Sequence, residues 1–161
     1  GTTGIQGMDL LGRKVMMQNG RAYGLYLEAI QRTIEKANGI DQLTSYTRKL
    51  EKACELLQSV TAHMKSLASN AEPEVFLADA TVYLEFFSII AVAWQWLKQM
   101  VSIQKGLEKK RSRSETRFYN GKFHAFRFFF SYELTKIHGL APRLMDSDRV
   151  TVEMQPELFN D

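Results

Sequence analysis

The stretch that decides the fold is FLADATVYLEFFSIIAVAWQWLKQM, which spans Phe76–Met100. Its residues 86–97 carry no charge and include two tryptophans, two phenylalanines and two isoleucines. A helix this apolar on nearly every side needs other elements packed around it. It is too short for a membrane span, which needs about 20 apolar residues, and Asp79, Glu85 and Lys98 bracket it closely. At a rise of about 1.5 Å per residue it would extend roughly 37 Å, so we expect the central helix of a soluble helical domain.

The composition indicates a single globular domain. The 161 residues allow one sizeable core, and 45% of them are hydrophobic and 11% aromatic. Three prolines and few β-branched runs favour helices over a sheet. The net charge of +3 is too small to argue for nucleic acid or a membrane surface. Cys54 is the only cysteine, so no internal disulfide forms and a reducing, cytoplasmic location is expected.

Apolar residues at helical spacing predict the remaining elements. A short opening helix follows Gly1–Gly4, with Thr2 or Thr3 as its cap, and Gln18-Asn19-Gly20 ends it. The expected long helices cover residues 21–37, about 42–69, 76–100 and 114–137. Asp41 and Ser114 are the expected N-caps of the second and the last of these helices. Pro73 is expected near the start of the central helix. We expect an all-α fold, in which a short N-terminal helix precedes a four-helix up-down bundle with short connections.

The last long helix carries an aromatic stripe. The stripe follows the spacing i, i+4, i+7 and i+11, and it comprises Tyr119, Phe123, Phe126 and Phe130. Phe118, Phe129 and Tyr132 are expected to widen this buried face. Such a stripe is far more typical of a core than of a cofactor site. Gly121 inside the helix predicts the close approach of a neighbouring helix.

We expect the chain to end in a short turn and a tail that packs on the bundle. The helix should end after His138-Gly139, and a last short turn should cover Leu140–Met145. The apolar residues of Val150–Phe159 are then expected to pack back on the bundle.

No metal or nucleophile constellation is found in the sequence. His63, His124 and His138 lack ligand spacing, and Cys54 is expected to pack as a small hydrophobic residue. We therefore predict no catalytic residue and no metal ligand within the chain.

Charged residues indicate surface features. The basic run 108–113 is interpreted as a solvated helix end rather than a nucleic-acid site, because no aromatic residues are interleaved with it. Near the apolar faces, three carboxylates are hypothesised to pair with Arg21, Lys98 or Arg127; they are Glu28, Asp79 and Glu85.

Two motifs resemble those of one enzyme family. The opening GTTGIQGMDLLGRKV resembles the stretch that follows the catalytic glutamate in FAD-dependent acyl-CoA dehydrogenases, Tyr-Glu-Gly-Thr-x-x-Ile-Gln. Gly1, Thr2, Ile5 and Gln6 match in register, and residues 9–14 match the continuation in the branch that carries an extra C-terminal helical domain. This branch includes enzymes resembling acetyl-CoA dehydrogenase and 3-methylmercaptopropionyl-CoA dehydrogenase. About a hundred residues later, FYNGKFHAFRFFF resembles the Phe-Tyr-x-Gly-Lys…Ala-x-Phe-Phe pattern of that extra domain.

The resemblance implies a division of the chain and a chemistry. Residues 1–18 would end the enzyme core, and residues 19–161 would form the C-terminal bundle domain. The parent enzyme would introduce an α,β double bond into an acyl-CoA thioester, with FAD as hydride acceptor. The catalytic glutamate would stand immediately before Gly1, so this piece of a longer protein would be inactive by itself.

The resemblance also assigns roles to the opening residues. Gly1 would approach the substrate thioester, and Thr2, Thr3 and Gly4 would lie beside the FAD. Gly4 departs from the glutamine of several family members, which removes one side-chain contact.

The partners implied are an acyl-CoA, an electron acceptor and further copies of the chain in a homo-oligomer, without nucleic acid or a membrane span. The alternative function is a helical protein-association module without cofactor contact, and a nucleic-acid binder is a distant third.

Overall fold

The computed structural model of the protein describes residues 1–70, 72–107, 112–146 and 148–159. Over these residues the chain is almost entirely helical, and they contain no strand. The all-α prediction is therefore confirmed. Residues 108–111, most of the basic run that we interpret as a solvated helix end, lie outside the described residues.

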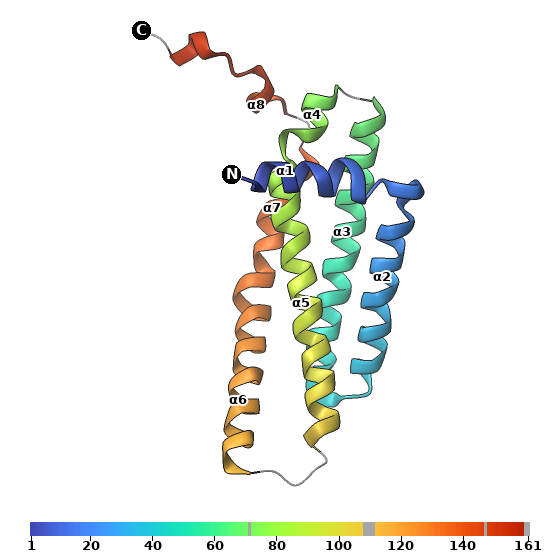
Figure 1. The fold of residues 1–161 in the computed structure, drawn as a ribbon, viewed down its shortest axis with the longest axis vertical. Helices are drawn as coiled ribbons and strands as arrows, with labels where there is room; N and C mark the ends of the chain where they lie inside the picture. Colours follow the sequence, from blue (N-terminus) through green and yellow to red (C-terminus); the bar gives the residue numbers. More distant parts are fainter. Residues whose placement is uncertain (71, 108–111, 147, 160–161) are drawn as a thin grey trace.

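The main helices are, in chain order, α1 (Thr3–Met8), the π-helical turn η1 (Asp9–Lys14), α2 (Met17–Asn38), α3 (Thr44–Asn70), α4 (Pro73–Ala78), α5 (Ala80–Leu107), α6 (Arg113–Phe128), α7 (Ile137–Met145) and α8 (Val150–Glu153). Shorter turns complete the chain: η2 (Asp41–Leu43), η3 (Phe129–Glu133), η4 (Leu134–Lys136) and η5 (Pro156–Phe159). In the described part of the chain, α2, α3, α5 and the run from α6 to α7 stand side by side as a bundle, and α1 lies across one end (Figure 1). This is the arrangement expected from the sequence.

The central helix is α5, which contacts α1, α2, α3, α6 and α7. Its completely buried residues follow the helical repeat, and they are Tyr83, Phe86, Ile90, Ala93 and Leu97. The predicted central helix is therefore confirmed, but its predicted start is wrong. The backbone of Asp79 (φ −99°, ψ 21°) leaves the helical region and separates α4 from α5. Pro73 is the first residue of α4, which places it near the start of the central element as predicted.

Within the described residues, the segment Ala80–Gln104 is long and apolar enough to cross a membrane by length and composition alone. Our expectation that the apolar run is too short for a span is therefore wrong on length. The central helix of a bundle passes the same test, and α5 packs against the helices around it, among them α1, α2 and α3.

A left-handed corner separates the opening segment from the bundle. Gln18 (φ 51°), Asn19 (φ 55°) and Gly20 (φ 84°) all have positive φ values. This conformation suits glycine and is tolerated by asparagine. The predicted break at these residues is confirmed, and the chain turns there from its path across the bundle into α2 (Figure 1).

The opening segment is held against the start of α5 by close backbone packing. A Cβ atom at Gly7 would lie 2.6 Å from the carbonyl oxygen of Ala80, so only glycine fits without displacement. Leu11 and Val15 continue from this crossing into the core. The close packing at Gly7 and the burial of Leu11 and Val15 therefore hold the first residues of the chain in place.

The helix that precedes the tail is longer than predicted. It does not end after His138-Gly139, because α7 continues to Met145 and includes Pro142. Ile137, Ala141 and Leu144 are buried, and α7 packs on α3 and α5. Burial of this apolar face outweighs the helix-breaking tendency of glycine and proline.

Two predicted helix caps are also wrong. Ser112, rather than Ser114, caps α6: its hydroxyl accepts a hydrogen bond from the Glu115 backbone N–H, and the Glu115 carboxylate accepts one from the Ser112 backbone N–H. This capping box is the S-x-x-E pattern. Asp41 begins a 3₁₀ turn without a side-chain cap, and α3 begins only at Thr44.

The aromatic stripe, which runs through α6 into η3, is core, but it is narrower than predicted. Phe126 and Phe130 are completely buried, whereas Phe118 is 60% and Tyr132 64% exposed. The prediction that Phe118 and Tyr132 widen the buried face is wrong, because no helix of the described chain covers that side. The predicted close neighbour at Gly121 is absent as well: no heavy atom of the described residues lies within 4 Å of where its Cβ would be.

The tail does not pack back on the bundle. Val150, Met154, Leu158 and Phe159 are all more than half exposed. Figure 1 shows the chain leaving the bundle after α7 and projecting beyond α4. The predicted return of Val150–Phe159 to the core is therefore wrong.

Candidate functional site

The four residues predicted to contact cofactor and substrate lie together at the start of α1. Gly1, Thr2 and Thr3 are exposed, and Gly4 is half-buried. Thr2 occupies the N-cap position, but its side chain makes no capping hydrogen bond. No hydrogen bond of the described residues uses the hydroxyl of Thr2 or of Thr3, so both hydroxyls face outward with their hydrogen-bonding capacity open.

An ion-pair cluster lies on the turn after α1. The Arg13 guanidinium donates to the Asp9 carboxylate from both Nε and Nη2, and Lys14 lies 3.2 Å from the same carboxylate. The Arg13 hydrogen bond, followed by the Lys14 contact, holds the pKa of Asp9 below its ordinary value. The pair stabilises the exposed side of η1, whose opposite side buries Leu11.

A small apolar cavity of about 130 Å³ lies beneath the opening segment. Its lining comes from η1, α2 and α5, and comprises Leu10, Lys14, Val15, Ala22, Tyr23, Tyr26 and Phe87. Tyr26 stacks on Phe87 with ring centroids 4.8 Å apart. Ligand sites for cofactors occupy roughly 300–1,000 Å³, so this cavity cannot enclose a flavin.

A larger cleft of about 440 Å³ lies between α5 and α6. It is lined by Gln95, Lys98, Gln99, Ser102, Ile103, Tyr119 and Lys122. Lys98 stands over the ring of Trp94 and Lys122 over that of Trp96, each 5.7 Å from the ring centroid. Lys98 follows Ala80 by 18 residues on one helix, roughly 27 Å along its axis, so the cleft lies far from the opening residues.

Buried hydroxyl groups gather where α2, α3 and α5 meet. The Thr61 and Tyr83 hydroxyls share a hydrogen bond of 2.8 Å, whereas the hydroxyls of Tyr23 and Tyr26 are buried without a partner among the described residues. Burial raises the pKa of Tyr26 and of Tyr83 above the ordinary value.

Cys54 packs as a small hydrophobic residue, as predicted. It is buried in α3, and its burial raises the pKa of the thiol to about 12. A thiol that stays protonated at neutral pH is a poor nucleophile.

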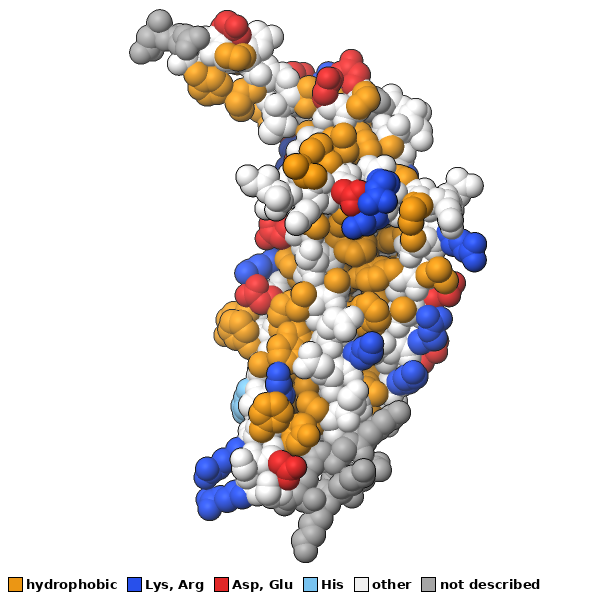
Figure 2. All heavy atoms as spheres, in the orientation of Figure 1, with side chains coloured by type: hydrophobic (Ala, Val, Ile, Leu, Met, Phe, Trp, Pro, Cys, Tyr) orange, Lys and Arg blue, Asp and Glu red, His pale blue; other side chains and the backbone are white. Residues whose placement is uncertain are grey.

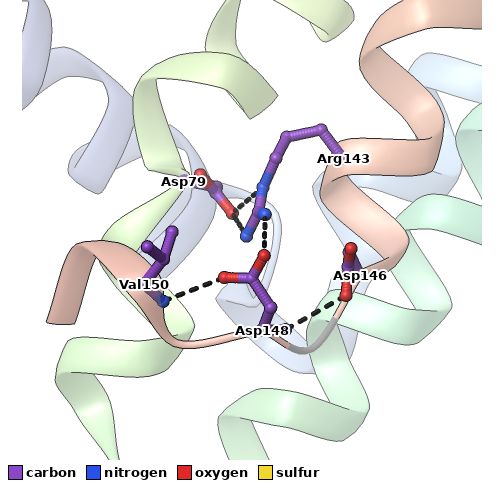
Figure 3. Close-up of polar contacts among 5 residues, drawn as sticks. All are labelled: Asp79, Arg143, Asp146, Asp148 and Val150. Atoms are coloured by element: carbon purple, nitrogen blue, oxygen red, sulfur yellow. Dashed lines mark hydrogen bonds and ion pairs between the residues drawn. The ribbon is translucent and has the colours of Figure 1, made fainter. Parts of the chain in front are cut away.

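A charged cluster that the sequence did not predict lies at the bend between α4 and α5. Arg143 donates from Nε and Nη2 to Asp79 Oδ2 at 3.1 and 2.9 Å, and from Nη1 to Asp148 at 3.0 Å (Figure 3). The Val150 N–H donates to the other oxygen of Asp148, and this bond, followed by Arg143, lowers the pKa of the Asp148 carboxyl. The cluster ties the bend between α4 and α5 to the end of α7 and the start of the tail.

The hypothesised ion pairs near the apolar faces are wrong for all three carboxylates. Asp79 pairs with Arg143, and Glu28 lies 3.6 Å from Arg32, rather than either pairing with Arg21, Lys98 or Arg127. Glu85 is exposed and takes part in no ion pair of the described residues. No group of histidine, cysteine and carboxylate side chains among the described residues could hold a metal ion.

The geometry defines the class of the protein as an all-α bundle domain with a short helical segment laid across one end. Residues 26–155 match the family described as acetyl-CoA dehydrogenase C-terminal like. The chain therefore belongs to this family of C-terminal, acyl-CoA dehydrogenase-like domains. No curated protein matches the chain. The match covers the bundle and confirms the resemblance there, whereas Gly1–Gly4 lie outside it.

Proposed function

We propose that this chain is the C-terminal portion of an FAD-dependent acyl-CoA dehydrogenase, which removes hydrogen from the α and β carbons of an acyl-CoA thioester. The observation that carries the proposal is the family match over residues 26–155, preceded in the same chain by the opening motif of Gly1–Gln6. Residues 1–18 would complete the enzyme core, and residues 19–161 would form a supporting or oligomerisation domain. The left-handed corner at residues 18–20 falls on this proposed boundary.

The opening residues fit a role beside the flavin. The first N–H groups of α1 have no partner within the helix, and helix N-termini bind phosphate oxygens. Thr2 and Thr3 are exposed, and no heavy atom of the described residues lies within 4 Å of a Cβ at Gly4, which leaves room for a ligand. Thr2, Thr3 and Gly4 would hold FAD through these amides and hydroxyls, and Gly1 would lie against the substrate thioester.

The chemistry divides between the cofactor and residues outside this chain. Bound FAD would accept the hydride from the β carbon. The glutamate that removes the α proton would precede Gly1 in the motif, so the 161 residues alone would be inactive. Within this chain, Gly7 and its contact with Ala80 keep the opening residues in place.

The visible spectrum of the full protein, recorded before and after addition of a panel of acyl-CoAs, tests the proposal. We expect flavin absorbance that bleaches with at least one thioester. Thr3→Val should reduce flavin retention, whereas the matched control Thr116→Val, at the distant start of α6, should leave it unchanged. A colourless protein that cannot be reconstituted with FAD would contradict the proposal.

The alternative is a protein-association module without cofactor contact. The observation that favours it is the exposure of several aromatic residues on the outer side of α6. The same spectra distinguish the two functions, because an association module would contain no flavin.

A further inference from the structure

The opening segment rests on the bend between α4 and α5. A Cβ atom at Gly7 would lie 2.6 Å from the Ala80 carbonyl oxygen and 3.1 Å from the Thr81 backbone nitrogen, so the two backbones are in direct contact. Farther along, a Cβ atom at Gly12 would lie 3.6 Å from the side chain of Leu77, which belongs to α4. The opening segment therefore contacts both of the helices that meet at the bend.

This contact leaves little freedom for the first residues of the chain. In Figure 2, hydrophobic side chains surround the opening segment, and acidic and basic side chains lie together on it. Thr3 precedes Gly7 by four residues, which is about one helical turn or roughly 6 Å along α1. Closely packed elements transmit small displacements, because they contain few voids that could absorb them. A shift of the bend against Gly7 would therefore move Thr2 and Thr3.

The geometry of the bend depends on Asp79. Its backbone leaves the helical region, and its carbonyl oxygen accepts the hydrogen bond from the Tyr83 N–H, at 2.9 Å, that begins α5. Its side chain is 17% exposed, and Arg143 is its ion-pair partner among the described residues. A carboxylate that is largely removed from water costs free energy unless a partner compensates its charge. Asp79 therefore keeps its place in the bend only while Arg143 binds it.

Arg143 is itself held in a fixed place. It lies on α7, which packs on α3 and α5 and buries Ala141 and Leu144. Two nitrogens of its guanidinium, Nε and Nη2, donate to Asp79 Oδ2 at 3.1 and 2.9 Å, and Nη1 donates to Asp148 at 3.0 Å (Figure 3). The contact joins two residues that are 64 positions apart. The end of α7 is therefore connected to the bend, and through the bend to the opening segment.

We propose that Arg143 is a positioning residue for Thr2 and Thr3, the residues beside the flavin. It holds the Asp79 bend, and the contact between the bend and Gly7 sets the place of the opening residues. This inference rests on the proposed function, because the position of Thr2 and Thr3 matters for the reaction only if they lie beside FAD. Arg143 touches neither the flavin nor the substrate in this arrangement.

Hydrogen exchange in the full protein tests the structural connection without reference to the flavin. Arg143→Gln removes the guanidinium that binds Asp79, so the backbone amides of residues 6–15 should exchange at least about threefold faster. Arg143→Lys keeps the positive charge but not the forked geometry and should give an intermediate rate. The matched control is Arg149→Gln, which removes an arginine whose partners lie outside the bend and should leave these amides unchanged. Unchanged exchange in Arg143→Gln, or equal acceleration in both variants, would overturn the proposal.

The affinity for FAD tests the functional consequence. The dissociation constant of FAD, measured by flavin fluorescence in the full protein, should rise at least about threefold in Arg143→Gln and by less in Arg143→Lys. Ser112→Ala serves as a control for general loss of stability, because it removes the helix cap at the distant start of α6. It should leave the affinity for FAD unchanged. An equal effect of Ser112→Ala and Arg143→Gln would overturn the proposal.

These measurements separate the failure of this inference from the failure of the proposed function. A full protein that binds no flavin would overturn the proposed function and this inference with it. Flavin that is bound equally well by the unsubstituted protein and by Arg143→Gln would overturn this inference alone.

Discussion

The inner and outer faces of the run from α6 through η3 have similar side chains and opposite environments. The inner face buries Phe126 and Phe130 completely, and Tyr46 of α3 contacts both rings at 4.5 and 5.4 Å between centroids. The outer face exposes Phe118, Phe128 and Tyr132 by more than half. Aromatic composition therefore does not decide which side of a helix is core, because the covering elements do. The four predictions below compare a covered position with an open one.

The largest difference is expected between Phe126→Ala and Phe128→Ala. Loss of the buried ring leaves a cavity, so Phe126→Ala should lower the free energy of unfolding by about 3–5 kcal/mol. Phe128→Ala should change it by less than about 0.5 kcal/mol at concentrations where the chain is monomeric. Urea denaturation measures both variants, and equal losses would show that the outer face is packed.

The next pair consists of two glycines whose replacement by alanine should change the stability in opposite directions. Gly7→Ala places a Cβ 2.6 Å from the Ala80 carbonyl oxygen, so it should cost about 1–3 kcal/mol. Gly121→Ala has open space around it and should stabilise α6 by about 0.5–1 kcal/mol. Thermal and urea denaturation of the two variants give the signs, and a shared sign would refute the contrast.

The third pair tests the start of α6. Ser112→Ala removes the capping hydrogen bond to the Glu115 N–H and should cost about 1 kcal/mol. Ser114→Ala lies inside the first turn, caps nothing and should change stability by less than about 0.5 kcal/mol. The helical circular dichroism signal during a urea titration measures the stability of both variants. A larger loss for Ser114→Ala than for Ser112→Ala would instead support Ser114 as the cap, as the sequence predicted.

The smallest effect on stability is expected when the pH is lowered. Asp148 has a folded pKa below its ordinary value, so its contribution is present near neutral pH and is lost as pH falls through the folded pKa, below about pH 4. The unsubstituted chain should therefore lose more stability between pH 6 and pH 3 than Asp148→Asn does. Unfolding midpoints across this range test the prediction, and parallel curves for the two chains would contradict it.

Much of the fold could be predicted from local patterns. The uncharged run of residues 86–97, the stripe through Phe126 and Phe130, and the left-handed corner at Gln18-Asn19-Gly20 all have local causes, so sequence spacing revealed them. The capping box at Ser112 was equally local, and the S-x-x-E pattern could have identified it.

Features that depend on distant neighbours could not be predicted in this way. Asp79 and Arg143 are 64 positions apart, and no local pattern joins them. The extension of α7 through Pro142 follows from burial of Ala141 and Leu144 against other helices. For the candidate site, the fold shows where Gly1–Gly4 lie, while their roles come from the family resemblance of the opening motif alone.

The buried thiol of Cys54 makes the chain convenient for spectroscopy. With a pKa of about 12, roughly one thiol in ten thousand would be ionised at pH 8, and maleimide reagents react with the thiolate. A cysteine introduced on the surface, for example at Leu158 or Phe128, should therefore be labelled selectively while Cys54 stays in place. Fluorescent dyes at those two positions would report the distance from the tail to α6 in solution, without the need for a cysteine-free background.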